Sequence, residues 1–162
     1  MMMILATLLF ATSAPQVLAP PPGREEPVAP YRIDPRNAGA TPFTGEQMAE
    51  TFGGQAGIRR IVDRFVTANF ADSRIGEIFK NQDAVRLRRV IFEQFCYILN
   101  AGCTYTGRDM RSAHANMGVQ QGDMNRLVEN LQRAMAAERV PFAAQNRFLS
   151  KLAPMRSNVV QR

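Results

Sequence analysis

Residues 105–119 read Tyr105-Thr-Gly-Arg-Asp-Met-Arg-Ser-Ala-His-Ala-Asn-Met-Gly-Val119, and the rest of the chain is best interpreted around them. The stretch contains His114, the single histidine of the sequence. A turn signal at Thr106-Gly107 precedes it, and Gly118 ends the short helix that would carry it. One imidazole supports metal chemistry only when a cofactor provides the remaining ligands. The function of His114 then depends on whether the surrounding sequence can enclose such a cofactor.

The composition is that of one globular domain with an appendage. Of the 162 residues, 46% are hydrophobic and 21% are charged, with 10 Phe, 9 Met and no Trp. Phe and Met fill large, irregular volumes without needing a polar partner. The net charge of +6 comes from scattered arginines, which are dense only at Arg86, Arg88 and Arg89. We interpret them as a solvated basic surface. Pairing with anions or propionates at a few arginines ranks second, and nucleic-acid binding ranks last, so no nucleic-acid partner is expected.

The N-terminal part of the chain predicts an export signal and a linker. Residues 1–23 are uncharged, and residues 3–14 form an apolar run that is too short to span a bilayer. It resembles a secretory signal, although no basic residue precedes it, so we expect a signal sequence over residues 1–14 and a periplasmic or secreted protein. The alternative is a cytoplasmic protein with a loose or misassigned N-terminus. Membrane contact is expected only if the segment is uncleaved. Proline-rich residues 15–43 read as a disordered or extended linker.

The remaining residues, 44–162, predict an all-α domain. A capping box at Thr44 and Gln47 begins a short helix, which the glycines at 53–54 break. Apolar residues at helical spacing then predict helices over residues 58–70, 83–99 and 124–135 and a last helix from Pro141 to Met155, with a short turn around Ile78-Phe79. No strand pattern competes with these helices.

The two cysteines, Cys96 and Cys103, have two interpretations. On an unbroken helix they would lie about 10 Å apart, which is too far for a disulfide. The helix break at residues 100–102 allows Cys103 to fold back toward Cys96. If the chain is exported, we expect a bridge between them. The alternative is two buried thiols that pack as small hydrophobes.

His114 also has several chemical interpretations when it is taken alone. Most lone histidines are surface residues or hydrogen-bonded core residues. No spacing in the sequence argues for a Ser-His-Asp or Cys-His catalytic set. One histidine and two cysteines are barely enough ligands for a zinc site, because such sites normally use three or four protein ligands. Haem requires one strong axial ligand and an apolar slot, and the sequence contains residues of both kinds.

A set of motifs runs through the predicted domain in a characteristic order. They are Phe52-Gly53-Gly54 with Ile58, Phe65, Asp72, Ile75-Gly-Glu-Ile-Phe79, Leu87, Tyr105-Thr-Gly-Arg-Asp-Met110, His114, Gly118-Val119, Val140-Pro141 and Leu152-Ala-Pro154. In their order and spacing these motifs resemble the group I truncated haemoglobins over about residues 46–160. The resemblance implies a truncated globin domain, a 2-on-2 helical sandwich around haem b.

The resemblance also implies roles for individual residues. His114 would be the proximal iron ligand through Nε2, with its Nδ1–H donating to a nearby carbonyl. Arg86 and Arg111 are the candidates for pairing with the haem propionates. The positions that would contact haem are otherwise apolar: Phe79, Leu87, Ile91, Phe95, Met110, Val119, Met124, Leu131, Phe148 and Leu152.

The distal side departs from the usual pattern of the group. Val66 stands where a tyrosine is usual, Ile91 where many members have glutamine, and Leu87 where larger globins have histidine. The Gly-Gly usually found before the proximal segment is replaced by Asn100-Ala101. The expected distal residues are Val66, Phe79, Leu87, Ile91 and Phe95, with Gln94 as the one nearby polar group. A hydrogen-bond donor stabilises bound dioxygen by roughly 1–3 kcal/mol. We therefore expect modest dioxygen affinity and comparatively good binding of carbon monoxide and nitric oxide.

Three functions are consistent with these features. The first is a haem protein with a five-coordinate iron that binds dioxygen, CO or NO for oxygen transport, storage, scavenging or sensing. The second is a haem enzyme with nitric oxide dioxygenase or peroxidase-like activity, which would need an electron-donor protein because the chain carries no reductase domain. Its rationale is weaker because the distal side is poor in polar groups. The third is a haem-free helical binding module that uses its basic surface.

Overall fold

The computed structural model describes residues 23–161, and every regular element in this range is a helix. None of these helices has the length and hydrophobicity that crossing a membrane requires. The expected signal sequence, residues 1–14, lies outside the described range, as do residues 15–22 of the expected linker. The elements are η1 (Pro35–Ala38), α1 (Gln47–Thr51), α2 (Gly54–Ala71), α3 (Gly76–Phe79), α4 (Ala84–Ile98), α5 (Met110–His114), α6 (Gln121–Ala137), α7 (Phe142–Leu152), η2 (Ala153–Met155) and α8 (Arg156–Val159).

Local signals in the sequence account for where the helices begin and end. The side chain of Asp83 accepts hydrogen bonds from the backbone N–H groups of Val85 and Arg86, at 2.9 and 3.0 Å, and so caps α4. After α4 the chain turns at Asn100, which has a left-handed φ of 59°. Gly53 precedes α2 and Gly54 is its first residue; their φ angles of 76° and 61° would strain a residue with a side chain. The predicted helices are therefore present, with boundaries close to those expected. The predicted capping box at Thr44 is wrong, because the residue before α1 is Glu46 and no side-chain hydrogen bond caps the helix.

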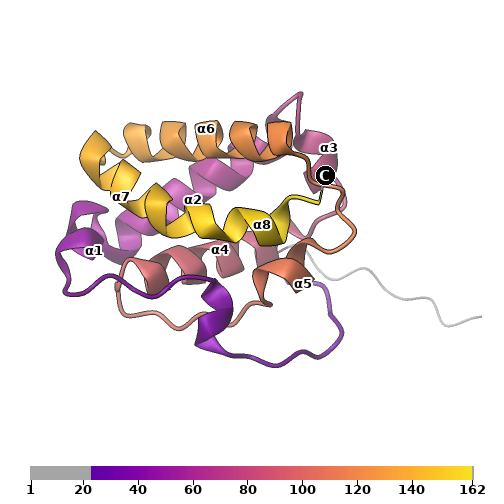
Figure 1. Ribbon diagram of the computed structural model, residues 1–162, viewed down its shortest axis with the longest axis horizontal. Helices are drawn as coiled ribbons and strands as arrows, with labels where there is room; N and C mark the ends of the chain where they lie inside the picture. The colour runs from indigo at the N-terminus through magenta and orange to yellow at the C-terminus, as the bar shows by residue number, and fades with distance from the viewer. Residues whose placement is uncertain (1–22, 162) are drawn as a thin grey trace, which may run out of the picture.

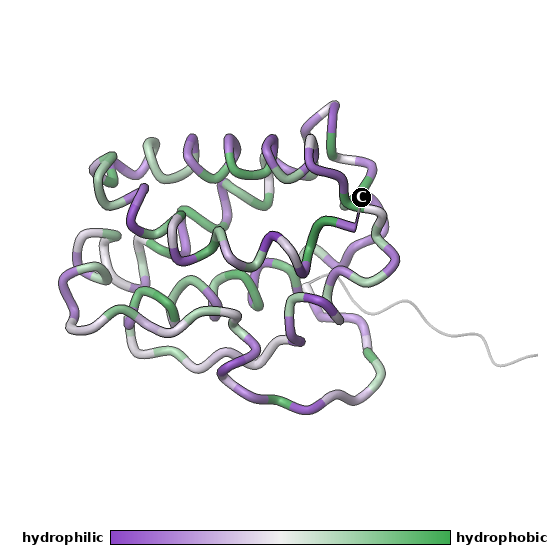
Figure 2. Tube along the Cα trace, viewed as in Figure 1, coloured by the Kyte–Doolittle hydropathy of each residue, from purple (hydrophilic) through white to green (hydrophobic). Residues whose placement is uncertain are grey.

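Helix α2 is the central element of the domain because it packs against both α4 and α6. Figure 1 shows α6 and α4 on opposite sides of α2, with α7 and α8 crossing in front of them. In Figure 2 the side of α6 that faces away from the rest of the domain is mostly hydrophilic, and the side that faces the other helices is mostly hydrophobic. This two-sided pattern follows from the helical spacing of apolar residues seen in the sequence.

Four phenylalanine rings join the layers of the core. The Phe95 ring on α4 lies 4.9 Å from that of Phe148 on α7 and 6.2 Å from that of Phe65 on α2. Phe52 completes the set at 5.3 Å from Phe148, which is fully buried. The two contacts of Phe148 are edge-to-face, the geometry that aromatic quadrupoles favour.

A buried polar joint fixes α2 against α6. The Asn130 side chain on α6 donates to the Asn69 side chain, at 3.0 Å, and to Asp72 Oδ2, at 3.1 Å. Arg126 also donates to Asp72, at 2.7 Å. The backbone N–H of Arg74 and these side-chain donors hold the pKa of Asp72 well below its usual range.

Residues 24–43, which we call the N-terminal strap, pack on the domain, so the contacts of the domain begin before the expected boundary at Thr44. Ala38 in η1 is fully buried, and the backbone at Gly39 approaches Met155 so closely that a Cβ would meet Sδ at 2.8 Å. The prediction of an extended linker followed from the lack of apolar periodicity. Residues 24–43 are attached by a few single contacts rather than by a helical face, so that pattern does not reveal them.

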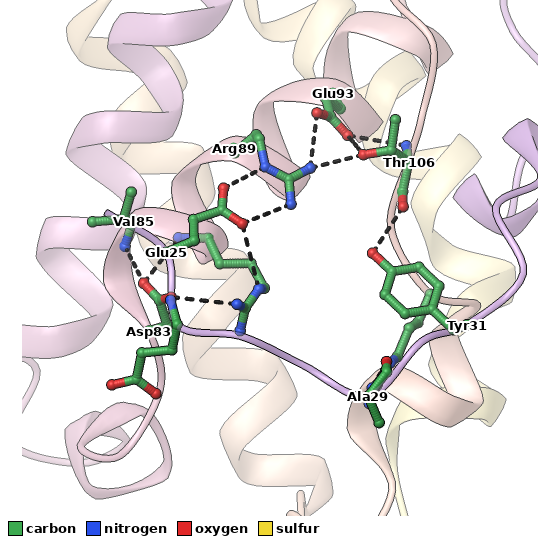
Figure 3. A network of polar contacts seen from close by, with 11 residues as sticks. Glu25, Ala29, Tyr31, Asp83, Val85, Arg89, Glu93 and Thr106 are labelled. Carbon is green, nitrogen blue, oxygen red and sulfur yellow. Dashed lines mark hydrogen bonds and ion pairs between the residues drawn. The ribbon is translucent and has the colours of Figure 1, made fainter. Parts of the chain in front are cut away.

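Polar contacts hold the first part of the N-terminal strap, as Figure 3 shows. The Glu25 carboxylate accepts hydrogen bonds from Nε and Nη2 of Arg89 on α4. Arg89 Nη1 also donates to Glu93 and Thr106, at 3.0 and 2.7 Å. Further along, the Tyr31 hydroxyl donates to the Thr106 carbonyl at 2.9 Å. The N-terminal strap is therefore joined to α4 and to the loop that leads into α5.

Candidate functional site

The short helix α5 carries His114, and its first turn is fixed by side chains. Asp109 accepts a hydrogen bond from the backbone N–H of Ser112 at 3.0 Å and caps the helix. The buried hydroxyl of Tyr105 donates to the carbonyl of Arg108 at 2.8 Å, so the turn before the cap is also held. A helix of five residues is too short to be stable alone, and these contacts set where it begins.

The geometry of His114 leaves one imidazole nitrogen available for a metal. Its Nδ1 lies 2.7 Å from the carbonyl oxygen of Met110, and because that oxygen only accepts, Nδ1 carries the proton. Nε2 then keeps its lone pair. Burial lowers the pKa of His114, which favours the neutral, ligating form at pH 7. A carbonyl at Nδ1 is the contact expected from the resemblance, and iron binding through Nε2 stays a prediction.

The predicted distal side chains are apolar, and they differ in burial. Val66 and Phe95 are buried in the core at 0% and 4% exposure, whereas Leu87 and Ile91 on α4 are only half-buried. Phe79 on α3 is buried, with its ring 5.8 Å from that of Phe70. Leu87 and Ile91 thus present more apolar surface than Val66 does.

Gln94, the predicted polar candidate of the distal side, is already engaged by other parts of the chain. Its Nε2 donates to the carbonyl of Ala38 in the N-terminal strap at 2.9 Å, and it lies 3.3 Å from Sδ of Met110. The amide therefore joins α4 to η1 and α5. No local pattern indicates this contact, because its partner lies 56 residues away in a segment interpreted as a linker.

The other predicted contact residues fall into two groups. Half of them are buried apolar side chains of the core, and the others are half-buried apolar side chains or arginines. Buried are Met110, Val119, Leu131 and Phe148; half-buried are Met124 and Leu152.

The two arginines predicted to pair with propionates have different surroundings. Arg86 forms ion pairs with Glu25 at 3.5 Å and with Asp83 at 3.6 Å, so carboxylates of the chain itself already neutralise it. Arg111, in α5, is exposed. The pairing of Arg86 with Glu25 could not be predicted, because the sequence does not indicate that the N-terminal strap returns to α4.

A disulfide joins Cys96 to Cys103, with 5.5 Å between their Cα atoms. In the turn between them, the backbone N–H of Ala101 donates to the Cys96 carbonyl at 2.8 Å. The side-chain amide of Asn100 donates to the carbonyl of Gly45 at 3.1 Å. The interpretation of the cysteines as a disulfide is therefore confirmed, and that of two buried thiols is wrong. The chain that leads to Tyr105 and α5 is thereby fixed to the end of α4.

The residues present fit a haem group, as judged by the donor set and by the apolar surface. Among residues 23–161 no group of three or more His, Cys, Asp or Glu side chains is placed to hold a metal ion. His114 offers one oriented nitrogen, which is what haem iron requires. Three helices also carry half-buried apolar side chains, and a flat apolar group such as haem would cover them further. They are Leu87, Ile91, Met124, Leu127 and Leu152.

His114 does not line either of two surface clefts. One, of about 470 Å³, lies between α2 and α6 and is rimmed by Arg64, Arg126 and Arg133. The other, of about 480 Å³, lies between the N-terminal strap and the start of α5 and includes Tyr31 and Asp109. Both are polar at the rim, and neither offers an imidazole.

Comparison with known proteins places the chain among globins. The sequence pattern of the bacterial-like globins matches residues 47–161. A group 1 truncated hemoglobin of Tetrahymena thermophila is 29% identical over 82 residues, which cover 51% of this chain and 68% of that protein. The group 1 truncated hemoglobin GlbN of Mycolicibacterium paratuberculosis is 24% identical over 106 residues, which cover 65% of this chain and 78% of that protein.

Solved structures share the fold. Truncated hemoglobin from Tetrahymena pyriformis in its Fe(III) form superposes with a TM-score of 0.67 at 23% identity, covering 71% of this chain and 98% of that one. The 2/2 hemoglobin from Synechococcus sp. PCC 7002, in the cyanomet state with covalently attached heme, gives a TM-score of 0.65 with the same identity and coverage. The all-α truncated globin fold expected from the sequence is therefore confirmed.

Proposed function

The chain belongs to the bacterial-like globin family, whose cofactor is haem iron, and on that basis we propose that it binds dioxygen or another diatomic gas at a five-coordinate haem iron. The observation that carries the proposal is the geometry of His114. Its Nδ1–H is fixed on the Met110 carbonyl at 2.7 Å, which leaves Nε2 as the single protein ligand. When bound, haem supplies an iron whose sixth position accepts a small diatomic ligand.

The distal side chains would select the ligand by shape and polarity. Val66, Leu87 and Ile91 have no hydrogen-bond donors, and the Gln94 amide is held by Ala38 and Met110. Dioxygen gains more from a donor than carbon monoxide or nitric oxide does. We therefore infer modest dioxygen affinity and comparatively strong binding of the other two gases.

Export to an oxidising compartment is part of the proposal. The Cys96–Cys103 disulfide supports it, because disulfides persist in secreted and periplasmic proteins and are rare in the cytosol. The signal-like residues 1–14 support the same location. An electron-donor protein in that compartment would keep the iron ferrous.

The absorption spectrum of the purified protein tests the proposal. We expect a Soret band in the wild-type chain and its loss in His114→Ala, with the helical circular dichroism signal of the variant retained. Adding free imidazole to the smaller variant His114→Gly is expected to restore part of the band, since imidazole can replace the missing ligand. A Soret band of unchanged position and intensity in His114→Ala would contradict the assignment of the ligand.

A second measurement distinguishes gas binding from enzymatic turnover. The dioxygen-loaded protein is mixed with nitric oxide, and nitrate is measured with and without an added reductase. We expect at most one nitrate per haem, because the distal side lacks the polar groups that assist repeated turnover. Sustained nitrate formation would favour the nitric oxide dioxygenase alternative.

A further inference from the structure

The chain immediately after His114 is irregular and needs support from elsewhere. Helix α5 ends at His114, and Ala115 already has an extended ψ of 133°. Asn116 and Gly118 follow with left-handed φ angles of 64° and 66°. The last carbonyls of any helix lack partners within the helix, and the His114 carbonyl is one of them. The backbone N–H of Met117 contacts it only weakly, at 3.3 Å.

Gln161, close to the C-terminus, supplies the missing partners. Its side-chain Nε2 donates to the His114 carbonyl at 2.6 Å, and its Oε1 accepts from the backbone N–H of Gly118 at 3.1 Å. The backbone N–H of Gln161 donates to the Val119 carbonyl at 2.9 Å. One residue therefore holds both ends of the irregular segment from His114 to Val119.

The position of Gln161 is itself fixed by packing. It follows α8 by two residues, and α8 packs directly against α5. Val159 at the end of α8 is buried at 7% exposure. Figure 1 shows the end of the chain returning beside the segment that joins α5 to α6. The packing of α8 therefore places Gln161, which follows it, beside the end of α5.

We propose that Gln161 is a positioning residue that sets the orientation of the His114 imidazole toward the haem iron. The amide fixes the His114 peptide from one side, and the Met110 carbonyl fixes the ring through Nδ1 from the other. With both contacts made, the ring cannot tilt without breaking a hydrogen bond. This inference rests on the proposed function, in which His114 is the iron ligand.

The test uses the full-length, haem-loaded protein and two variants. Gln161→Leu removes the donor and the acceptor, whereas Gln161→Glu keeps the acceptor for Gly118 and removes the donor to His114. The iron–histidine stretching band of the ferrous protein is measured by resonance Raman spectroscopy, and haem loss is measured by transfer to an excess of an apoglobin. We expect both variants to shift or broaden the band, with haem loss about three- to tenfold faster, as one or two net hydrogen bonds imply.

Gln82→Leu is the matched control, because Gln82 is an exposed glutamine in the turn before α4, and among residues 23–161 its side chain forms no hydrogen bond to α5 or to residues 115–119. It is expected to leave the band and the rate of haem loss at wild-type values. The proposal is overturned if Gln161→Leu and Gln161→Glu both leave the iron–histidine band unmoved, even if they lower the melting temperature. A failure of the proposed function has a different signature, namely a Soret band that survives His114→Ala.

Discussion

Helix α5, which carries His114, has five residues, whereas α2 and α4, which carry the predicted distal side chains, have 18 and 15. Directed hydrogen bonds hold the short helix: Asp109 at its start, Met110 within it and Gln161 at its end. Helices α2 and α4 are held mainly by the packing of apolar side chains. One side of the proposed haem is thus fixed in orientation, while the other is fixed mainly in shape.

This difference matches what each side has to do. A ligand nitrogen must point at one place, and hydrogen bonds are directional. A distal wall that admits a small gas needs only a shape, which packing determines without polar groups. We therefore expect substitutions on the two sides to change different measured quantities.

The largest expected effect comes from the apolar side. Phe95→Ala removes a ring that contacts Phe65 and Phe148 in the core. We expect the free energy of unfolding to fall by about 3–5 kcal/mol, measured by urea denaturation. Phe142→Ala is the control, because Phe142 is 70% exposed, and it is expected to change little. Equal losses in the two variants would show that the Phe95 ring adds nothing to the core.

The disulfide connects the two sides, since it fixes the chain leading to α5 against the end of α4. Replacing Cys96 and Cys103 by serine is expected to cost about 2–3 kcal/mol, the value for a short closed loop. Thermal unfolding with and without a thiol reductant measures this cost. The reductant should lower the melting temperature of the wild type and leave that of the double variant unchanged.

Ile91→Gln places a donor on the apolar side and so makes the two sides more alike. We expect dioxygen dissociation to slow by about 5- to 150-fold, which corresponds to roughly 1–3 kcal/mol. Stopped-flow dissociation kinetics measure the change. Val85→Gln on the same helix is the control, because Val85 is 38% exposed, and it should leave the rate unaltered. An Ile91→Gln rate equal to that of the wild type would contradict the distal role of this position.

The smallest effect is expected at the cap of α5. Asp109→Ala should lower the free energy of unfolding by about 1 kcal/mol at pH 7, whereas Asp109→Asn should retain most of it. Hydrogen bonds from Ser112 lower the pKa of Asp109 from 3.8. The stabilisation is therefore present above pH 3.8 and is lost as the pH falls through the lower folded-state pKa. A difference between wild type and Asp109→Ala that stays constant well below pH 3.8 would exclude a role for the charge.

Much of the fold and part of the site could be predicted because they depend on local patterns. The apolar spacing along α2, α4 and α6 placed these helices, since a helical face must be buried. The stretch around His114 indicated the proximal segment, through a cap at Asp109 and a stop at Gly118. These signals lie within a few residues of the feature that they specify.

Contacts between distant segments could not be predicted in the same way. Arg86 is predicted to pair with a propionate, which stays a prediction, and the structure adds an ion pair with Glu25, 61 positions earlier in the chain. Gln94 was expected on the distal side, and its amide is taken by Ala38. Nothing in the sequence around Gln161 indicated its contact with His114. Each of these is a single polar pair without periodicity, so a pattern search has nothing to detect.

The sequence by itself determined that the domain is all-α, that His114 is the one imidazole, and that the predicted distal positions Val66, Leu87 and Ile91 have no donors. These are matters of residue type and spacing. Only the tertiary structure decided which groups hold His114, where Gln94 and Arg86 direct their donors, and that the N-terminal strap belongs to the folded domain. The reason is physical: hydrogen bonds and ion pairs act over about 3–4 Å, and only the folded chain brings residues from distant positions within that range.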